Sequence, residues 1–557
     1  MKRKSESPSD LSRRRFLRSS AIGVGATAMV AATPGVAVGA VRSDSAQYRP
    51  GAEPLAPLPP PAKWDLECDV AVVGAGGAGM SAAVTAAENG AKVVLVEKNP
   101  WCGGDTSLTS GAEGNLGSRM QKRIGAPELT IDQRVQYWLS IPGPTAFPCP
   151  QMLHQIVEEQ GPTFDWLEDM GVRVCEDVIF DWLPEKLGIG HTPIDPEHPE
   201  EGWQRWHPFN GRGFTQALEK RARALGIPIL LESPVCALVA RSGRVVGVVS
   251  KSQGGTKYIG AKTVILTTGG FSANKEMLLK YVPGRKIEDV RTMSYPGATG
   301  DGIRMAQGLG AVVDIMNEIE RWDGGALWHA NSVGEAHAWY YEMSNQLVRQ
   351  KSLTVNLLGK RFFDESALFG YHYAYQGAAS QAQKDHTSFT LFDEDCIRKE
   401  DIIKKFKPFA CEYPTRWWDE MFPKYLADGT IMKAQSIPEI AQKMGVDPGE
   451  LTKTVTRYND LCDKKHDDDF FKSADYMQPI RRPAFYAVKQ RGGTMFNTWG
   501  GLVVDEHFRV LNKEWKAIPG LYVAGENAAG GARVAFCLPA GRLAGRNATL
   551  AALGKQV

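Results

Sequence analysis

The sequence lacks the motifs by which proteins commonly bind metals or attach haem. Its nine cysteines are scattered, and no C-x-x-C or C-x-x-C-H occurs among them, which excludes c-type haem attachment and leaves no spacing for an iron–sulfur cluster. No group of His and Cys has the spacing of a zinc site, and H-E-x-x-H is absent. We therefore expect no metal centre and interpret the cysteines as buried thiols rather than disulfides.

The body of the chain also lacks an excess of positive charge. Residues 1–40 hold seven Lys or Arg against two acidic residues, a net charge of +5, so the net charge of +2 for the whole chain leaves −3 (2 − 5) for the remainder. The body of the chain is therefore nearly neutral and lacks the excess of basic residues that is typical of nucleic-acid-binding domains. The 557 residues, 43% of them hydrophobic, are enough for two or three domains with sizeable cores.

The positive charge at the N-terminus belongs to a pattern that is typical of export. The arginine cluster Arg13–Arg15 precedes an apolar run rich in Ala and Gly, which ends in small residues near Ala40 and is too short to span a bilayer. This predicts a twin-arginine signal peptide over residues 1–40, with a basic disordered tail as the alternative. Such export carries folded proteins to the periplasm or the outer face of the cell membrane, so a cofactor must be loaded first. Residues 41–65 are rich in proline and predict a linker.

The stretch "CDVAVVGAGGAGMSAAVTAAENGAKVVLVEK", which begins at Cys68, predicts a dinucleotide site. An apolar strand leads to Gly74, Gly76 and Gly79, spaced as G-x-G-x-x-G; a helix of small residues follows, and a second strand ends at Glu97. The first glycine allows a tight turn, the second lets the backbone approach a pyrophosphate, and the third lets helix and strand pack closely. The helix N-terminus then faces the phosphates and Glu97 accepts from a ribose hydroxyl. A glycine-rich packing helix is the alternative.

Later segments decide between NAD and FAD. Gly103–Asn115 follows the second strand with small residues and hydroxyl groups, while Thr263–Asn274 and Ile518–Gly531 each contain a strand that ends in Gly-Gly or Gly-Glu. Strand ends that return to one nucleotide from the far end of the chain indicate a cofactor that spans much of the domain. This favours FAD.

These segments, together with Gly297–Ala311, resemble the flavoprotein family of soluble fumarate reductases and 3-ketosteroid dehydrogenases over residues 66–550. The resemblance implies an α/β fold: a Rossmann-like FAD-binding domain at 66–312 and 486–557, with an inserted α+β capping domain for the substrate at 313–485. It also implies that FAD is bound without a covalent link. The cofactor-binding residues that it implies are Gly74, Gly76, Ala78, Gly79, Glu97, Lys98, Gly104, Asp105, Thr106, Gly111, Val235, Gly269, Asp301, Glu526 and Leu543.

The same family carries G-[KR]-R-F-x-x-E at the flavin face, which Gly359–Glu365 matches. Four residues after that Glu, its fumarate reductases hold a proton-donating Arg and its ketosteroid dehydrogenases a catalytic Tyr, whereas this chain has Phe369. Phenylalanine has no proton to give. The candidate donors are therefore the neighbouring Tyr371 or Tyr373, with His372 as an alternative. The other interpretation is that these aromatic residues merely line the cap.

Further positions argue against fumarate as the substrate. Asn497 stands where fumarate reductases carry a substrate-binding His, and a second carboxylate-binding Arg falls at Phe536 or Cys537, with Arg533 as a shifted replacement. A dicarboxylate in a dry pocket needs paired cations, because an unpaired buried charge is costly. Where ketosteroid dehydrogenases hold the ketone oxygen, this chain has Cys537–Gly541. The Asn497 amide or the Gly541 backbone N–H is expected to bind the carbonyl oxygen of a substrate.

Together these features predict an FAD-dependent reductase of an activated C=C bond in an enone or enoate. Because the cap region 313–485 is rich in Trp and Tyr, the substrate is expected to be flat and apolar or aromatic, steroid-like compounds included. A 3-ketosteroid-type dehydrogenase and a flavin oxidase remain alternatives, and a non-catalytic electron carrier would leave the aromatic cap unexplained. No haem motif or second flavin module is visible, so electrons are expected from a separate partner, such as a cytochrome or a quinol-linked protein.

Overall fold

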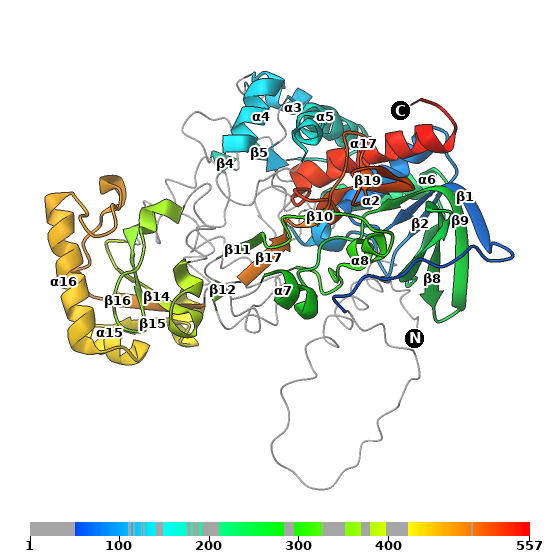
Figure 1. Cartoon of the computed structure of the whole chain (residues 1–557). Coiled ribbons are helices and arrows are strands. Elements are labelled where there is room, and N and C mark those ends of the chain that lie inside the picture. Colours follow the sequence, from blue (N-terminus) through cyan, green and yellow to red (C-terminus); the bar gives the residue numbers. More distant parts are fainter. Residues whose placement is uncertain are drawn as a thin grey trace, which may run out of the picture.

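The chain forms two lobes of unequal size, seen side by side in Figure 1. The larger lobe contains the first and the last strands of the chain, and the smaller lobe is built from its middle. The computed structural model describes residues 51–109, 113–114, 117–123, 125, 128–140, 149–174, 180–181, 189–191, 211–282, 294–322, 325–326, 351–368, 379–396, 422–491 and 494–556.

A mostly parallel sheet forms the centre of the larger lobe. Its strands are β1 (Leu66–Val73), β2 (Val93–Val96), β6 (Ile229–Leu230), β7 (Val235–Arg241), β8 (Arg244–Ser252), β9 (Gly255–Leu266), β19 (Arg509–Leu511) and β20 (Ala517–Val523). The order is β19-β20-β9-β1-β2-β6, with β8 pairing β9 and β7 pairing β8. β1 pairs in parallel with both β2 and β9, and β20 pairs in parallel with β9. The apolar run of β2 is buried throughout, as expected for a central parallel strand.

Two helices pack on this sheet and on each other through glycines. They are α2 (Gly77–Glu88) and α17 (Val534–Ala552). A Cβ on Gly541 would lie 2.2 Å from the carbonyl oxygen of Ala78, and one on Gly545 would lie 2.5 Å from that of Ala82. The two backbones can therefore approach closely only because these positions have no side chain.

Further elements surround this core. Helices of the larger lobe include α3 (Arg119–Arg123), α4 (Ile131–Ser140), α5 (Pro150–Asp169), α6 (Arg212–Ala224), α7 (Lys275–Tyr281) and α8 (Asp301–Gln307). A small antiparallel sheet comprises β3 (Glu113–Gly114), β4 (Phe180–Asp181) and β5 (Ile189–His191). Within the described ranges, no helix has the length and the apolar character needed to cross a membrane.

Residues 51–65, called the strap below, lie against the larger lobe. Leu58 pairs in parallel with the edge of β7: its N–H donates to the Leu238 carbonyl and its carbonyl accepts from the Ala240 N–H, both at 2.9 Å. The expectation of a linker is therefore wrong for this part of 41–65. A proline-rich composition favours an extended chain, and here the extended chain pairs with a strand edge instead of bridging open space.

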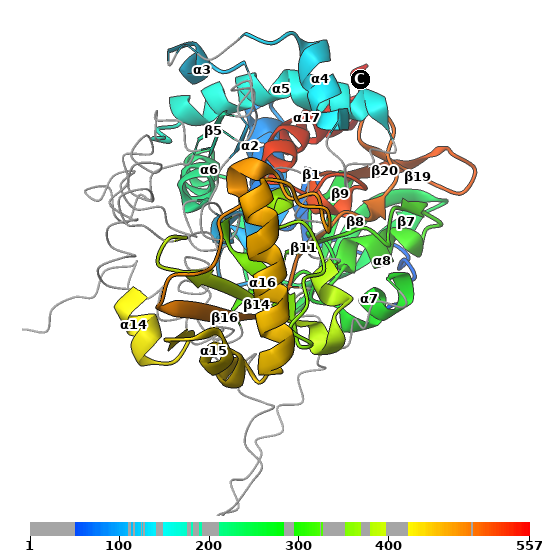
Figure 2. The same cartoon turned by 90° about the vertical axis from the view of Figure 1, so that its left-hand side faces the viewer.

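The smaller lobe is an α+β domain with a hydrophobic core separate from that of the larger lobe. Its antiparallel sheet has the order β12-β16-β14-β13, and β15 also pairs with β16. Helix α16 lies on the side of the sheet that faces away from the larger lobe (Figures 1 and 2). The elements are β12 (Gly325–Ala326), β13 (Leu353–Asn356), β14 (Thr387–Asp393), β15 (Ile431–Ala434), β16 (Phe485–Arg491), α14 (Phe422–Ala427), α15 (Ile437–Met444) and α16 (Pro448–Lys464). The predicted architecture, an α/β domain with an inserted α+β domain, is confirmed.

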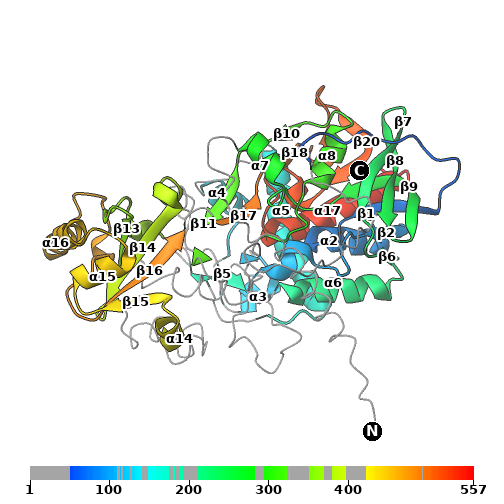
Figure 3. The same ribbon diagram turned by 90° about the horizontal axis from the view of Figure 1, so that it is seen from below.

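The boundaries between the lobes differ from the predicted ones. Met316 and Ile319 belong to the core of the larger lobe, and β16 is a strand of the cap sheet up to Arg491. The predicted change of domain at residue 486 therefore divides a strand, and the cap is shifted toward higher numbers at both ends. Two antiparallel ribbons join the lobes, β10 with β18 and β11 with β17 (Figure 3). Their strands are β10 (Val313–Asp314), β11 (Ile319–Trp322), β17 (Thr494–Thr498) and β18 (Gly501–Leu502).

Candidate functional site

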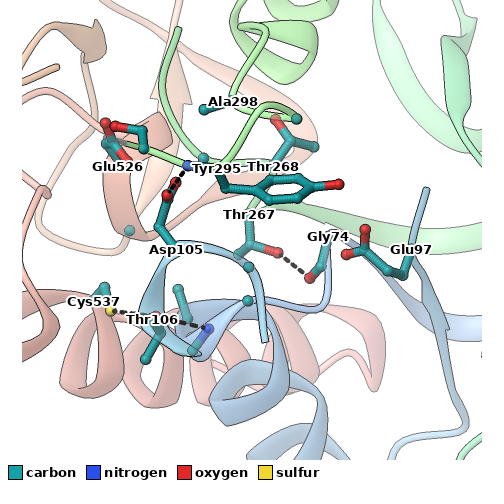
Figure 4. Close-up of a pocket in the computed structure, with 18 of the residues that line it drawn as sticks. Gly74, Glu97, Asp105, Thr106, Thr267, Thr268, Tyr295, Ala298, Glu526 and Cys537 are labelled. Carbon is teal, nitrogen blue, oxygen red and sulfur yellow. Dashed lines mark hydrogen bonds between the residues drawn. The ribbon is translucent and has the colours of Figure 1, made fainter. Parts of the chain in front are cut away.

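A cavity lies where the carboxyl ends of four parallel strands meet. Gly74 follows β1, Glu97 follows β2, Thr267 follows β9 and Gly525 lies just beyond β20, and all four line the cavity. It encloses about 1300 Å³ of space, its open mouth included. Figure 4 looks into it. Open α/β sheets bind ligands at this edge, because loops from several strands converge there.

The glycines of G-x-G-x-x-G have distinct roles at the turn that borders the cavity. Gly74 has a φ of +103°, and a Cβ there would lie 2.3 Å from the Thr267 carbonyl oxygen. A Cβ on Gly79 would lie 1.8 Å from the Gly74 carbonyl oxygen, so the helix packs tightly on the turn. A Cβ on Gly76, by contrast, would come no closer than 4.0 Å to another atom, the Gly103 carbonyl oxygen. The N-terminus of α2 has no side-chain cap and no acidic residue in its first turn, so its positive end suits a phosphate.

Glu97 faces the same cavity from the end of β2. Its Oε2 accepts from the Ala75 N–H at 2.7 Å, and its Oε1 accepts from the Asn99 N–H at 2.9 Å. Burial raises the pKa of Glu97, while these N–H groups act in the opposite direction. The carboxylate is thus fixed beside the glycine turn, where a dinucleotide ribose needs an acceptor.

Lys98 and Asp301 form an ion pair in the cavity wall. The Lys98 Nζ lies 3.0 Å from the Asp301 carboxylate and 3.0 Å from the Thr299 hydroxyl. The same ammonium donates to the Gly297 carbonyl. Asp301 is the first residue of α8, so this pair joins the end of β2 to that helix.

Two partly buried carboxyl groups lie at the other end of the cavity, Asp105 and Glu526 (Figure 4). The Thr498 N–H and hydroxyl both donate to Glu526 Oε1, at 2.8 and 3.1 Å, and Asp105 accepts from the Tyr295 N–H. Burial and the nearby Asp105 raise the pKa of Glu526 to about 8, and burial raises the pKa of Asp105 to about 6. A protonated carboxyl both donates and accepts hydrogen bonds, so this end of the cavity suits a polar ring system.

The strand β17 and the start of α17 complete this polar end. Asn497 lines the cavity, and its buried Oδ1 has no hydrogen-bond partner among the residues that the structure describes. Arg533 also lines it, with its guanidinium carbon 5.3 Å from the centre of the Trp499 ring. The sulfur of Cys537 lies 4.0 Å from the Thr106 hydroxyl. An amide, a cation and a thiol thus border the same space.

Most of the predicted cofactor residues line this cavity. Besides those described above, they include Ala78, Gly104, Thr106, Val235 and Gly269.

Some lining residues were not predicted. Tyr295 belongs to no motif of the sequence. Thr268, which donates to Asn527, stands directly before Gly269 and Gly270, and a threonine beside such glycines carries no signal of its own.

Other predicted residues lie elsewhere. Gly541 is inside α17, where it packs on α2, so the expectation that its N–H faces a substrate is not met: the helix interior uses that group. Leu543 is in the same helix and does not line the cavity, and neither does Gly79, which packs against the Gly74 turn. Gly111 and the candidate acids Tyr371, His372 and Tyr373 lie outside the described residues.

The segment Gly359–Glu365 is part of the cap interior. Arg361 lies 2.8 Å from the carboxylates of both Glu365 and Asp467, and Lys472 lies 3.6 Å from Glu365, with all four side chains at most 4% exposed. Burial raises the pKa of Glu365, but Lys472 and Arg361 outweigh it, and the pKa is lowered. None of the described residues of this segment lines the cavity. Its expected place at the flavin face therefore stays a prediction, and the buried ion pairs of Arg361 tie the segment to the cap.

The cavity fits an extended dinucleotide. The open backbone at Gly76 and the uncapped end of α2 suit its phosphates, and Glu97 suits a ribose. The lining then continues to Asp105 and Glu526 at the other end of the cavity. These residues, drawn from both ends of the chain, are those expected to hold FAD.

Comparison with known proteins places the chain among flavoproteins. A family described as FAD binding domain matches residues 69–543. A urocanate reductase of Eggerthella lenta is 31% identical over 86% of this chain and 74% of its own length. A vinyl phenol reductase of Lactiplantibacillus plantarum is 27% identical over 86% and 96%. An NADH:fumarate oxidoreductase of Klebsiella pneumoniae is 28% identical over 87% of this chain, which spans only 48% of that protein.

Solved structures share the fold. The 3-ketosteroid Δ4-(5α)-dehydrogenase of Rhodococcus jostii RHA1, in complex with 4-androstene-3,17-dione, superposes with a TM-score of 0.68 at 25% identity, over 90% of this chain and all of that one. A flavocytochrome c3 fumarate reductase in its open conformation gives a TM-score of 0.67 at 25% identity, over 88% and 80%. The family match covers most of the chain and the cavity fits FAD, so the chain belongs to the FAD binding domain family and is an FAD-dependent oxidoreductase.

Proposed function

We propose that this oxidoreductase reduces the C=C bond of an α,β-unsaturated carbonyl compound, an enone or an enoate. The observation that carries the proposal is the continuity of the cavity, in which the cofactor cradle at α2 leads to a polar end bordered by Asn497, Arg533 and Glu526. Two relatives are named as reductases, of urocanate and of vinyl phenol, and both compounds have a C=C bond conjugated to an aromatic ring.

The residues of this chain have two tasks in such a reaction. When bound and reduced by two electrons from the separate donor, FAD would supply the hydride for the β-carbon of the substrate. Negative charge then develops on the carbonyl oxygen, and the amide of Asn497 and the guanidinium of Arg533 are donors that line the cavity and can stabilise it. The second task is protonation of the α-carbon by a positioned acid. The candidates for this acid remain Tyr371 and Tyr373, with His372 as the alternative.

A second candidate is the reverse reaction, dehydrogenation of a 3-ketosteroid, which the likeness to the Rhodococcus dehydrogenase favours. The same oxygen-binding groups serve both directions, because the charge on the carbonyl oxygen is the same in both. A flavin oxidase, the third possibility, would differ in the rapid reoxidation of its reduced flavin by air.

The test is anaerobic reoxidation of the photochemically reduced enzyme by a panel of compounds: cinnamate, urocanate, 4-phenylbut-3-en-2-one, a steroid enone and fumarate. We expect at least one aromatic enone or enoate to restore the spectrum of oxidised flavin when it is mixed with the reduced enzyme. Fumarate should restore that spectrum only slowly. Reduction of the oxidised enzyme by a saturated 3-ketosteroid, with no reoxidation by any unsaturated compound, would establish the dehydrogenase instead. Asn497→Ala is the matched variant and should slow reoxidation without loss of flavin.

We further propose that the protein works outside the cytoplasm and receives its electrons from a separate protein. Arg13–Arg15 and the apolar run after it support export, and the absence of a c-type haem motif from the sequence supports an external donor. Replacing the three arginines with lysine should leave FAD-loaded protein in the cytoplasmic fraction. Unchanged export of that variant would contradict the twin-arginine route.

A further inference from the structure

A tryptophan is exposed at the tip of the hairpin that joins β19 to β20, residues 512–516, called the tip below. Trp515 is 66% exposed, and Figure 2 shows the hairpin reaching out from the larger lobe. The Trp515 N–H donates to the Asn512 carbonyl at 2.9 Å, and the Asn512 Oδ1 accepts from the Glu514 and Lys516 N–H groups at 3.1 and 2.9 Å. The indole is thus presented to solvent on a fixed turn.

The fold itself gives no reason for a tryptophan at this position. Its φ of 57° lies in the left-handed region, which glycine and asparagine adopt readily and bulky residues rarely. Trp515 belongs to the hydrophobic core of neither lobe. Residues held in such conformations cluster at functional sites, where the surrounding structure fixes them. The conformation and the exposure of Trp515 together point to a contact with another surface.

The tip also carries a net positive charge. Lys513 and Lys516 flank Trp515, both are exposed, and neither forms an ion pair with a residue that the structure describes. Glu514 is the acidic residue of the tip, so the net charge of residues 512–516 is +1 (2 − 1). An aromatic residue between two lysines suits a surface that is negatively charged and apolar beneath.

The neighbouring hairpin adds positive charge at the same end of the sheet. Arg241 and Arg244 are exposed at the turn between β7 and β8. Strand β20 lies against β8, since a Cβ on Gly520 would come within 2.5 Å of the Val245 carbonyl oxygen. The two hairpins therefore lie side by side, and four basic residues surround Trp515 or lie on the adjacent turn.

We propose that the tip is a docking surface for an anionic lipid membrane, with Trp515 at the level of the headgroups and Lys513 and Lys516 on the lipid phosphates. Tryptophan favours this level because its ring is apolar while its N–H can donate, and anionic headgroups attract exposed lysines. The inference goes beyond the proposed function and does not depend on the substrate. The seven residues of β20 separate the tip from Gly525 in the cavity wall by about 20 Å, so docking leaves the cavity accessible.

A membrane fits the tip better than a protein partner does. A stable protein–protein interface buries roughly 800 Å² on each side around an apolar core. Trp515 is the apolar residue of the tip, and the other four are charged or Asn. A fluid lipid layer accepts one protruding indole without a complementary pocket, which a protein surface must supply.

The test measures co-sedimentation of the FAD-loaded full-length protein with vesicles. We expect vesicles of equal parts phosphatidylglycerol and phosphatidylcholine to bind the wild type, phosphatidylcholine vesicles to bind it more weakly, and salt to reduce the difference. Trp515→Ala should weaken binding to the anionic vesicles about tenfold, and Lys513→Gln or Lys516→Gln about fivefold each. Phe471→Ala is the matched control and should change nothing: Phe471 is 79% exposed with a φ of 60°, but it follows a run of aspartates in the cap.

Two further variants keep the test decisive. Trp515→Gly relieves the positive φ, so it should unfold at no lower temperature than the wild type while it binds vesicles as weakly as Trp515→Ala. Trp515→Phe should retain most of the binding, but brominated lipid should quench less of its tryptophan fluorescence, because the indole that enters the lipid is gone. Residues 1–40 are common to all variants, and binding through them alone would leave this quenching unchanged.

Three results would overturn the proposal. They are a wild type that does not bind the anionic vesicles, a Trp515→Ala variant that binds them as the wild type does, and equal quenching of wild type and Trp515→Phe by brominated lipid. Absence of any vesicle binding would leave an acidic protein surface as the partner of the tip.

Discussion

Glu526 is an acidic residue whose surroundings favour its protonated form, and this predicts a pH dependence of stability. Its pKa is raised to about 8 by burial and by Asp105, whereas an unfolded Glu titrates near 4.3. Between these values the folded state binds a proton that the unfolded state has released, so the contribution to stability is greatest below the unfolded pKa and is lost as the pH rises toward 8. The unfolding temperature of the flavin-free protein should therefore fall over this window.

The measurement compares unfolding temperatures of wild type and Glu526→Gln across that pH range in the flavin-free protein. The glutamine cannot ionise, so its profile should be flatter, and the difference between the two should grow with pH. Glu514→Gln, at an exposed position on the β19–β20 hairpin, is the matched control and should follow the wild type. Parallel profiles for Glu526→Gln and wild type would show that Glu526 does not carry the proton.

Single residues also show how far the sequence predicts this site. Gly74, Gly79 and Glu97 were predictable, because their roles depend on backbone geometry within one short stretch of chain. Tyr295 was not, since its position opposite Asp105 depends on packing between segments 190 residues apart. The motif around Arg361 was recognised, but its partner Asp467 lies 106 residues away, and only the folded cap shows that they are buried together.

At the scale of elements, the strap is predicted to stabilise the cofactor domain through α8. The Arg304 side chain of α8 donates to the Glu53 carbonyl at 2.9 Å, and its own carbonyl accepts from the Leu55 N–H at 2.9 Å. The helix begins at Asp301, which lines the cavity. Arg304→Met keeps the aliphatic stem but removes a buried charged donor, and should cost roughly 1.5–3 kcal/mol of unfolding free energy.

Thermal unfolding and limited proteolysis measure this effect. Arg304→Met should lower the unfolding temperature and speed cleavage within residues 51–65, and FAD should dissociate more readily. Lys280→Met is the control, because Lys280 also contacts the strap, at the Ala52 carbonyl, but its side chain is 38% exposed. Equal stability of both variants and the wild type would mean that the strap lies on the domain without supporting it.

Element types were easier to predict than element boundaries. The strand that ends at Glu97 and the helix after Gly76 follow from hydrophobic pattern and glycine spacing. The sequence of the strap predicts a linker, because a proline-rich extended chain has the same composition whether it is solvated or paired with a strand edge. The predicted boundary at residue 486 falls inside β16, which pairs with β14 and β15 in the cap. The sheet to which a strand belongs depends on its pairing partners, and the sequence of the strand alone does not show them.

At the scale of the whole molecule, the two lobes have separate cores and are joined by ribbons of short strands. FAD contacts are expected outside the cap among the described residues, since those that line the cavity belong to the larger lobe or to the ribbon strand β17. The buried cluster of Arg361, Glu365, Asp467 and Lys472, by contrast, belongs wholly to the cap. Ligand binding and this cluster should therefore stabilise different cooperative units.

Differential scanning calorimetry is expected to show two transitions that respond to different changes. Removing FAD should lower the transition temperature of the larger lobe and leave the transition temperature of the cap unchanged, because a ligand stabilises only the unit that binds it. Arg361→Met should do the reverse: it leaves two buried carboxylates without their shared partner and should cost the cap about 3–5 kcal/mol. Lys453→Met, which removes an exposed cation from the same domain, controls for the loss of charge and should shift neither transition. A single transition that moves with both FAD removal and Arg361→Met would show that the ribbons couple the lobes into one cooperative unit, and the cluster would then help to retain the cofactor from a distance.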